Sequence, residues 1–142
     1  MSNTFAQPEE GNFMRTLTIA AALAVAFTFT ACTTASIQNV NQAPVVAAQG
    51  KTLNHDQVRA AILRAGAALR WQMADEGPNM IVGTLNLRTH TAVVEIPYST
   101  STYSIKYRSS VNLNEKDGMI HKNYNGWIQN LTRGINTQLS LL

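Results

Sequence analysis

The sequence predicts an α+β domain in which two helices pack on one face of a three- to four-stranded antiparallel meander, in the order α-β-β-β-α. Two observations predict the elements. Apolar residues recur at helical spacing around residues 54–73 and 123–139, and three segments between them alternate apolar and polar residues. Polar turns separate these three segments, which favours antiparallel pairing of consecutive strands.

The first helix is predicted to begin after Asn54, whose side chain suits an N-cap, and Asp56 favours the positive end of the helix. Its apolar stripe consists of Val58, Ala61, Ile62, Ala65, Leu69 and Met73. Gly66 costs a helix up to about 1 kcal/mol relative to alanine, so we expect it to mark a close contact with the sheet. Gly77 and Pro78 end the predicted helix.

The predicted strands are residues 80–88, 91–98 and 102–109, each rich in β-branched or aromatic residues. Alternation predicts one buried face, made of Ile81, Gly83, Leu85, Leu87, Ala92, Val94, Ile96, Tyr98, Tyr103, Ile105 and Tyr107. The other face is expected to be solvated and carries Thr84, Asn86, Arg88, Val93, Glu95, Lys106 and Arg108. Pro97 lacks an N–H, which predicts a strand end or an edge there.

The second helix is predicted over residues 123–139, after a surface turn at residues 114–118. Its stripe has a helical period and consists of Tyr124, Trp127, Ile128, Leu131, Ile135, Gln138 and Leu139. Each helix therefore has one apolar face to bury, and we expect both to cover the same face of the sheet.

The segment from Met14 has the three parts of a secretory signal. Met14 and Arg15 form a short cationic start, residues 17–29 form an uncharged, mostly apolar core, and Ala31 precedes Cys32, the only cysteine. The core is shorter than the roughly 20 apolar residues that span a bilayer. We therefore predict a signal peptide over residues 1–31. Because residues 1–13 carry acidic charge where a cationic region belongs, we expect translation to start at Met14.

Phe29-Thr30-Ala31-Cys32 resembles the lipobox of bacterial lipoproteins, although Leu, Val or Ile is usual where this chain has Phe29. The resemblance implies cleavage after Ala31, diacylglycerol on the Cys32 sulfur, and acylation of the new amino terminus with a fatty acid such as palmitate. Several acyl chains on one residue hold a protein firmly at a membrane. Thr33, in place of Asp, is similar to the pattern that is sorted to the outer membrane, with the domain in the periplasm.

The mature chain of about 110 residues is predicted to divide into two parts. Residues 32–52 comprise the lipidated cysteine and a flexible tether, because the stretch up to Gly50 has no charge and no helical or strand period. Residues 53–142 are the predicted periplasmic domain. The mature part has ten Lys or Arg against six Asp or Glu, a net charge of +4. In the envelope, this charge is either an ordinary solvated surface or a binding surface for an anionic polymer (cell wall or lipopolysaccharide). The expected partner is such a polymer or an envelope protein, and not nucleic acid.

The sequence shows no catalytic, metal or cofactor motif. His55, His90 and His121 lack the close spacing of metal ligands, and no nucleophile elbow or phosphate-binding glycine loop is present. Most acidic residues fall at predicted helix ends or turns, and Glu95 is expected to pair across strands. The protein is therefore predicted not to be an enzyme, with no cofactor and no metal.

Two groups of residues are candidate sites. Arg88, Lys106 and Arg108 lie on the predicted solvent face, where they form either an anion-binding face or an ordinary charged surface. His121 and Tyr124 either line a small polar-aromatic cleft or help to dock the second helix on the sheet.

Residues 83–90, 94–98, 103–107, 110–113 and 120–128 resemble a family of small proteobacterial lipoproteins of uncharacterised function. The most distinctive part is the Ile-His-x-x-Tyr-x-x-Trp-Ile stretch at residues 120–128. The resemblance covers about residues 58–135 and implies an α+β domain, but no activity. The prediction is an outer-membrane-anchored, non-enzymatic binding or envelope-assembly module. The alternatives are a small periplasmic hydrolase with a site near His121 and Tyr124, and a purely structural envelope protein.

Overall fold

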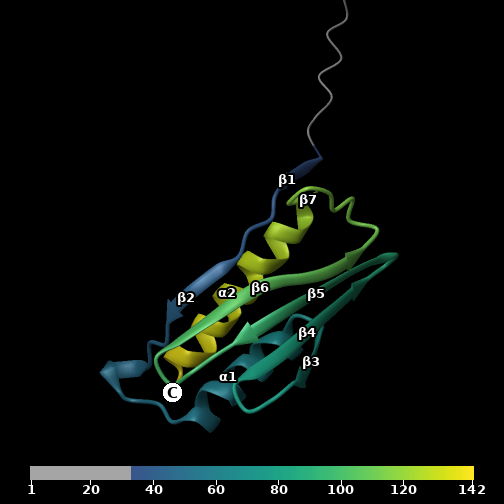
Figure 1. Cartoon of the computed structure of the whole chain (residues 1–142). Coiled ribbons are helices and arrows are strands. Elements are labelled where there is room, and N and C mark those ends of the chain that lie inside the picture. Colours follow the sequence, from purple (N-terminus) through teal and green to yellow (C-terminus); the bar gives the residue numbers. More distant parts are fainter. Residues whose placement is uncertain (1–32) are drawn as a thin grey trace, which may run out of the picture. The chain divides into compact units, whose positions relative to one another are not determined.

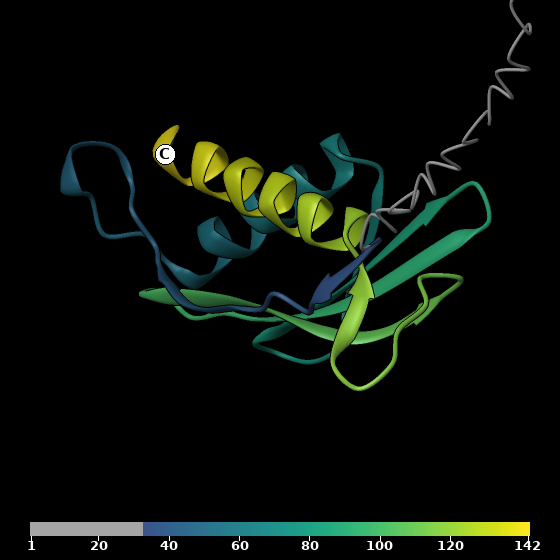
Figure 2. The same ribbon diagram turned by 90° about the horizontal axis from the view of Figure 1, so that it is seen from above.

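The structure, a computed structural model, describes residues 33–142, in which two helices cover one face of an antiparallel sheet (Figures 1 and 2). The elements in chain order are β1 (Thr34–Ser36), β2 (Val40–Pro44), η1 (Ala48–Gly50), α1 (His55–Ala68), β3 (Trp71–Asp75), β4 (Met80–Leu87), β5 (His90–Pro97), β6 (Thr102–Val111), β7 (Met119–His121) and α2 (Asn123–Ser140). The sheet has five strands in the order β2-β6-β5-β4-β3, and β1 pairs with β7 in a separate two-stranded sheet. The α+β class is confirmed, with more strands than predicted.

The central meander is confirmed in its antiparallel pairing, and the bounds of each strand lie within two residues of the predicted ones. β4 and β5 pair antiparallel from Met80 opposite Pro97 to Leu87 opposite His90, which leaves Arg88 and Thr89 as the turn. β5 and β6 pair with one register shift beside Val93. β5 ends at Pro97, as expected of a residue without an N–H.

The first helix starts as predicted and ends earlier than predicted. Asn54 and Gln57 form a capping box, in which each side chain accepts the other residue's backbone N–H at 2.9 Å. The helix ends at Ala68, and Arg70 takes a positive φ of 66° that reverses the chain into β3. Met73 therefore lies in a strand and not on the helical stripe, because pairing with β4 stabilises the extended conformation.

Gly66 lies against the sheet, as predicted. A Cβ atom added there would lie 2.3 Å from the Met73 sulfur on β3. A side chain at this position would displace the Met73 side chain, so the glycine permits the close approach of the helix to this edge of the sheet.

The prediction of a flexible tether is wrong over residues 34–44, which form two paired strands. β1 pairs with β7, with Ala35 opposite Ile120, and β2 pairs with β6, with Val40 opposite Ile105. The backbone groups of this segment find partners about 60 to 90 residues later in the chain, which a local sequence pattern does not show. The folded part thus begins at the amino-terminal side of Leu53, the predicted start of the domain.

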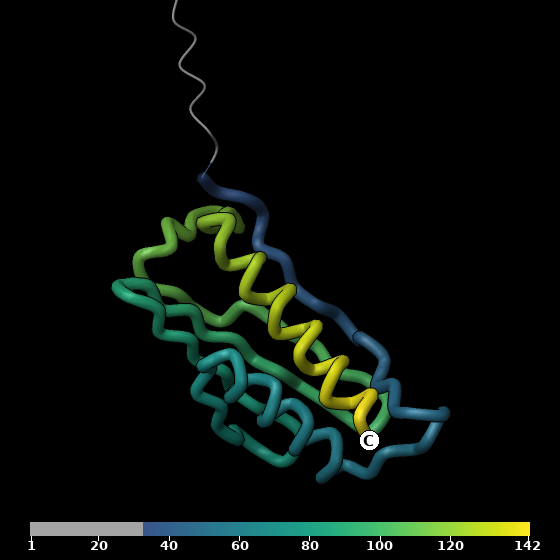
Figure 3. The backbone as a smooth tube through the Cα atoms, turned by 180° about the vertical axis from the view of Figure 1, so that it is seen from behind, coloured from purple at the N-terminus to yellow at the C-terminus, as the bar shows by residue number. Residues whose placement is uncertain are grey.

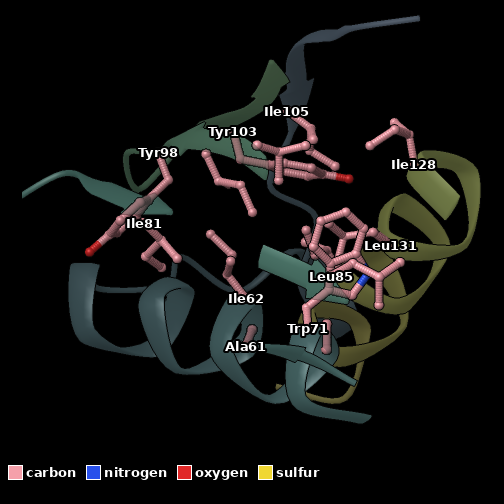
Figure 4. Close-up of a cluster of buried hydrophobic side chains, with 14 of the residues drawn as sticks. Ala61, Ile62, Trp71, Ile81, Leu85, Tyr98, Tyr103, Ile105, Ile128 and Leu131 are labelled. Carbon is pink, nitrogen blue, oxygen red and sulfur yellow. The ribbon is translucent and has the colours of Figure 1, made fainter. Parts of the chain in front are cut away.

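The core lies between the helices and the sheet. Figure 3 shows α1 and α2 side by side on the sheet, and a Cβ added at Gly134 of α2 would lie 3.3 Å from Leu69 beside α1. Figure 4 shows side chains of β3 to β6 meeting those of both helices, among them Ile62, Trp71 and Leu131. Within residues 33–142, no helix is long and apolar enough to cross a membrane.

Candidate functional site

A pocket of about 300 Å³ lies where β5 turns into β6. Its lining residues are Gln42, Pro97, Tyr98, Ser99, Thr102, Ser104 and Lys106. Ser104 and Lys106 alternate along β6 with the buried Tyr103 and Ile105, so they point to the face that the helices leave open. We refer to this cavity as the Lys106 pocket.

The hydroxyls of the turn organise one side of the Lys106 pocket. The Ser99 hydroxyl accepts the backbone N–H groups of Ser101 at 3.2 Å and Thr102 at 3.1 Å. The Ser99 N–H donates to the Thr102 carbonyl at 2.8 Å. A hydroxyl that bonds the backbone of its own turn in this way holds the turn in one conformation, so this wall of the pocket is preformed.

An irregularity in β2 forms the opposite side. The register of β2 against β6 shifts between Val40 and Ala43, and Gln42 takes a positive φ of 49°. Its N–H donates to the Ser104 hydroxyl at 2.9 Å. A non-glycine residue in this region of φ is uncommon and adopts it only where tertiary contacts hold it there. Sequence reasoning missed Gln42, because it placed the residue in the tether.

Lys106 supplies the positive charge of the pocket. Glu95 lies opposite it in the register of β5 and β6, but the Glu95 carboxylate approaches Arg108 Nε at 3.7 Å. Among residues 33–142, no carboxylate lies within 4 Å of the Lys106 ammonium. The cation is therefore free to bind an anion that enters the pocket.

Two neighbouring carboxylates compensate the positive charge of Arg108. Its guanidinium donates to the Glu76 carboxylate at 2.7 Å and also lies near Glu95. The hydrogen bond to Glu76 raises the pKa of Arg108. Arg108 thus differs from Lys106, although the sequence grouped the two residues on one face.

Arg88 lies apart from both. It occupies the turn between β4 and β5, at a φ of 58°, whereas Lys106 pairs with Glu95, five positions along β5 from His90, where that turn ends. The structure therefore does not bring Arg88, Lys106 and Arg108 into one binding face. The spacing in the sequence could not separate them, because it fixes the face of a strand and not the ion pairs on it.

His121 and Tyr124 do not share an open cleft. The Tyr124 side chain is completely buried and packs edge-on against Tyr107, with ring centroids 5.6 Å apart. His121 is half-buried, and its Nδ1 accepts the Asn123 N–H at 3.3 Å. Its ring stacks on His90 at a centroid distance of 6.4 Å. The docking interpretation of Tyr124 fits this burial, and the cleft interpretation does not.

A polar cluster also joins the start of α1 to β3 and the turn after it. Arg59 forms a two-point ion pair with Asp75, and the bonded guanidinium holds the pKa of the Asp75 carboxyl below its usual range. His55 Nε2 lies 2.7 Å from the Asn79 side-chain oxygen, and the His55 ring packs on Tyr98. Each polar group has a local partner, so the cluster fastens the helix to the sheet.

Asn125 is a second residue that sequence reasoning missed. Its buried side-chain amide donates to the Ser36 carbonyl at 2.8 Å and accepts the Gln38 N–H at 3.0 Å. It therefore holds the segment between β1 and β2 against α2. Nothing in the helical pattern distinguishes it from an exposed asparagine.

Ala31 and Cys32, the predicted cleavage and lipid-attachment residues, lie outside the described residues. Within residues 33–142, no three His, Cys, Asp or Glu side chains gather as metal ligands. No family model, curated protein or solved structure matches the chain. The resemblance to small proteobacterial lipoproteins therefore stays a prediction.

Proposed function

We propose that this protein is a lipid-anchored protein of the bacterial outer membrane whose periplasmic domain binds an anionic envelope ligand without transforming it. The attachment rests on Cys32 and the lipobox-like residues before it. The ligand class rests on one observation: the Lys106 side chain lines an open pocket, and among residues 33–142 no carboxylate lies within 4 Å of its ammonium.

The walls of the Lys106 pocket suit a phosphate or carboxylate group. Lys106 provides a point charge, and the hydroxyls of Thr102 and Ser104 can donate to an anion, whereas the Ser99 hydroxyl already accepts two N–H groups of its own turn. The volume of about 300 Å³ is at the lower end of the range for small-molecule sites, so it suits one charged group and not a whole polymer. Cell-wall fragments and lipopolysaccharide both carry such groups.

An NMR titration of residues 33–142 with cell-wall fragments, lipopolysaccharide and anionic lipid micelles tests the proposal and separates the ligand sources. We expect saturable shifts around Lys106 and Ser99 with one of the three. Lys106→Gln should weaken that binding at least about tenfold, the effect of losing a hydrogen bond to a charged group. Lys116→Gln makes the same charge change on an exposed turn outside the pocket, so it should leave the affinity unchanged.

Absence of saturable shifts in all three titrations would contradict an anionic ligand at Lys106. It would favour a protein partner, which crosslinking in intact cells would identify. The membrane attachment is tested separately, because Cys32→Ser should release the protein from the membrane fraction. Persistence of the Cys32→Ser variant in that fraction would contradict the lipid anchor.

A further inference from the structure

The chain enters the fold at a defined place. The Thr33 carbonyl accepts the N–H of Lys122 at 2.9 Å, and β1 begins at the next residue. Thr33 is bonded directly to Cys32, so consecutive Cα atoms are only about 3.8 Å apart there. If Cys32 carries the lipid, as the proposed function states, no flexible spacer separates the membrane from the folded domain.

Backbone contacts connect this point to the rest of the same end of the domain. The His121 N–H donates to the Leu113 carbonyl at 2.8 Å, and the Asn112 side chain donates to the Thr89 carbonyl at 2.8 Å. β1, β7 and the turn between β4 and β5 therefore lie at one end, as Figure 1 shows. We call this the attachment end, comprising residues 33–36, 87–90 and 111–122.

The attachment end exposes apolar side chains. Val111 is 55% exposed, and Leu87 and Met119 are each 39% exposed. These three belong to the five large apolar side chains that are exposed within residues 33–142. Scattered exposed apolar residues are ordinary, but these three all belong to the end of the domain that leads to Cys32, where the strand register places Leu87 and Val111 on opposite faces of the sheet.

The charges at this end are nearly balanced. Arg88, Lys116 and Lys122 are exposed there, and Glu115 and Asp117 lie in the same turn as Lys116. An excess of one positive charge attracts an anionic surface only weakly. Contact with a bilayer at this end therefore depends on the lipid attachment and the apolar side chains more than on the lipid charge.

We propose that the attachment end rests on the headgroup layer of the membrane that holds Cys32, with Leu87, Val111 and Met119 in contact with it. The short covalent connection and the exposed apolar side chains at the same end carry the inference. The Lys106 pocket lies toward the start of β6, whose ten residues span about 30 Å, and so faces away from the bilayer.

Fluorescent labels on introduced cysteines test the orientation in the lipidated, full mature protein. Cys32 is the only native cysteine and is blocked by the lipid, so Val111→Cys and Val46→Cys each give one labelling site. Val46 is a matched control, because it is 61% exposed and follows Val45, which bonds the turn at Ser101 at the opposite end. The probe is a phosphatidylcholine vesicle, with or without phosphatidylglycerol, containing lipids with a headgroup quencher.

We expect the label at residue 111 to be quenched at least about threefold more strongly than the label at residue 46, since contact extends roughly 5–10 Å into the interface. Phosphatidylglycerol should change this ratio little. Equal quenching of the two labels on protein that floats with the vesicles would overturn the docking and leave the anchor intact. Failure of the protein to float would overturn the anchor, and the docking with it.

Discussion

The attachment end and the pocket end of the sheet use their polar groups differently. At the attachment end, backbone groups from distant segments bond to one another, as the Lys122 N–H does to the Thr33 carbonyl at 2.9 Å. At the pocket end, which comprises residues 97–104, the turn satisfies its own polar groups, and Lys106 beside it has no ion pair within residues 33–142. The hydrogen bonds of the attachment end therefore fix the position of the chain, whereas the pocket end leaves the charge of Lys106 available to a ligand.

Residues 33–44 join the two ends. Their first residues bond β7, and Gln42, near their last, forms one wall of the Lys106 pocket. The segment that was expected to be a spacer is therefore part of both the attachment and the pocket.

Deleting residues 33–44 should have the largest effect on this comparison. A chain that begins at Val45 should lose about 4 kcal/mol of unfolding free energy relative to one that begins at Thr33, because Ile37, Val40 and Ala43 pack against the core. Urea unfolding of the two chains measures the difference. Equal stability would show that the segment is a tether after all.

Some features of the fold were predictable because they are local in sequence. Alternation and the N-cap residue Asn54 act within a few positions, and they predicted β4 to β6 and the start of α1. β1 has three residues, too few for a pattern, and its partner lies about 85 positions away. Trp71–Asp75 continued the helical period, so only the pairing with β4 identifies β3. Lys106 has no ion pair within residues 33–142 because the Glu95 carboxylate lies near Arg108 instead. The direction of the Glu95 side chain is set by tertiary packing, which the sequence pattern does not show.

Alkaline pH should weaken the packing at both ends. Burial raises the pKa of Tyr103, at the pocket end, to about 12, and burial also raises the pKa of Tyr124, on α2 beside the attachment end. The folded state thus holds these protons more tightly than the unfolded chain, whose tyrosines titrate near pH 10. The stability is fully present below pH 10 and falls as the pH rises from 10 through about 12.

Tyr103 alone should account for about 3 kcal/mol of this loss. Urea unfolding between pH 8 and 12 measures it, and Tyr103→Phe should show a shallower decline than the native chain. Identical slopes for the two chains would contradict the assignment to Tyr103.

Asn125→Ala should loosen the attachment end specifically. The substitution leaves the Ser36 carbonyl and the Gln38 N–H without their partner, which should cost about 2 kcal/mol. Asn130→Ala is the control on the same helix, because Asn130 is exposed and bonds only Arg133, and it should change stability by less than about 0.5 kcal/mol. Hydrogen exchange should rise in residues 34–40 with Asn125→Ala. Equal exchange in both variants would show that the Asn125 side chain does not hold this segment against α2.

Tyr103 and Tyr124, whose side chains are both fully buried, should respond to loss of their hydroxyls with opposite signs. Tyr103 donates to the Asn136 side-chain oxygen at 2.7 Å, so Tyr103→Phe should cost about 1 kcal/mol. The Tyr124 hydroxyl is buried and has no hydrogen-bond partner among residues 33–142. Tyr124→Phe should therefore raise the unfolding free energy by about 1 kcal/mol, since it removes a polar group whose desolvation is not compensated. Urea unfolding of both variants measures the two effects. A loss of stability in Tyr124→Phe would mean that the Tyr124 hydroxyl has a hydrogen-bond partner in the core, so that the buried polar groups beside the attachment end are paired like those on its surface.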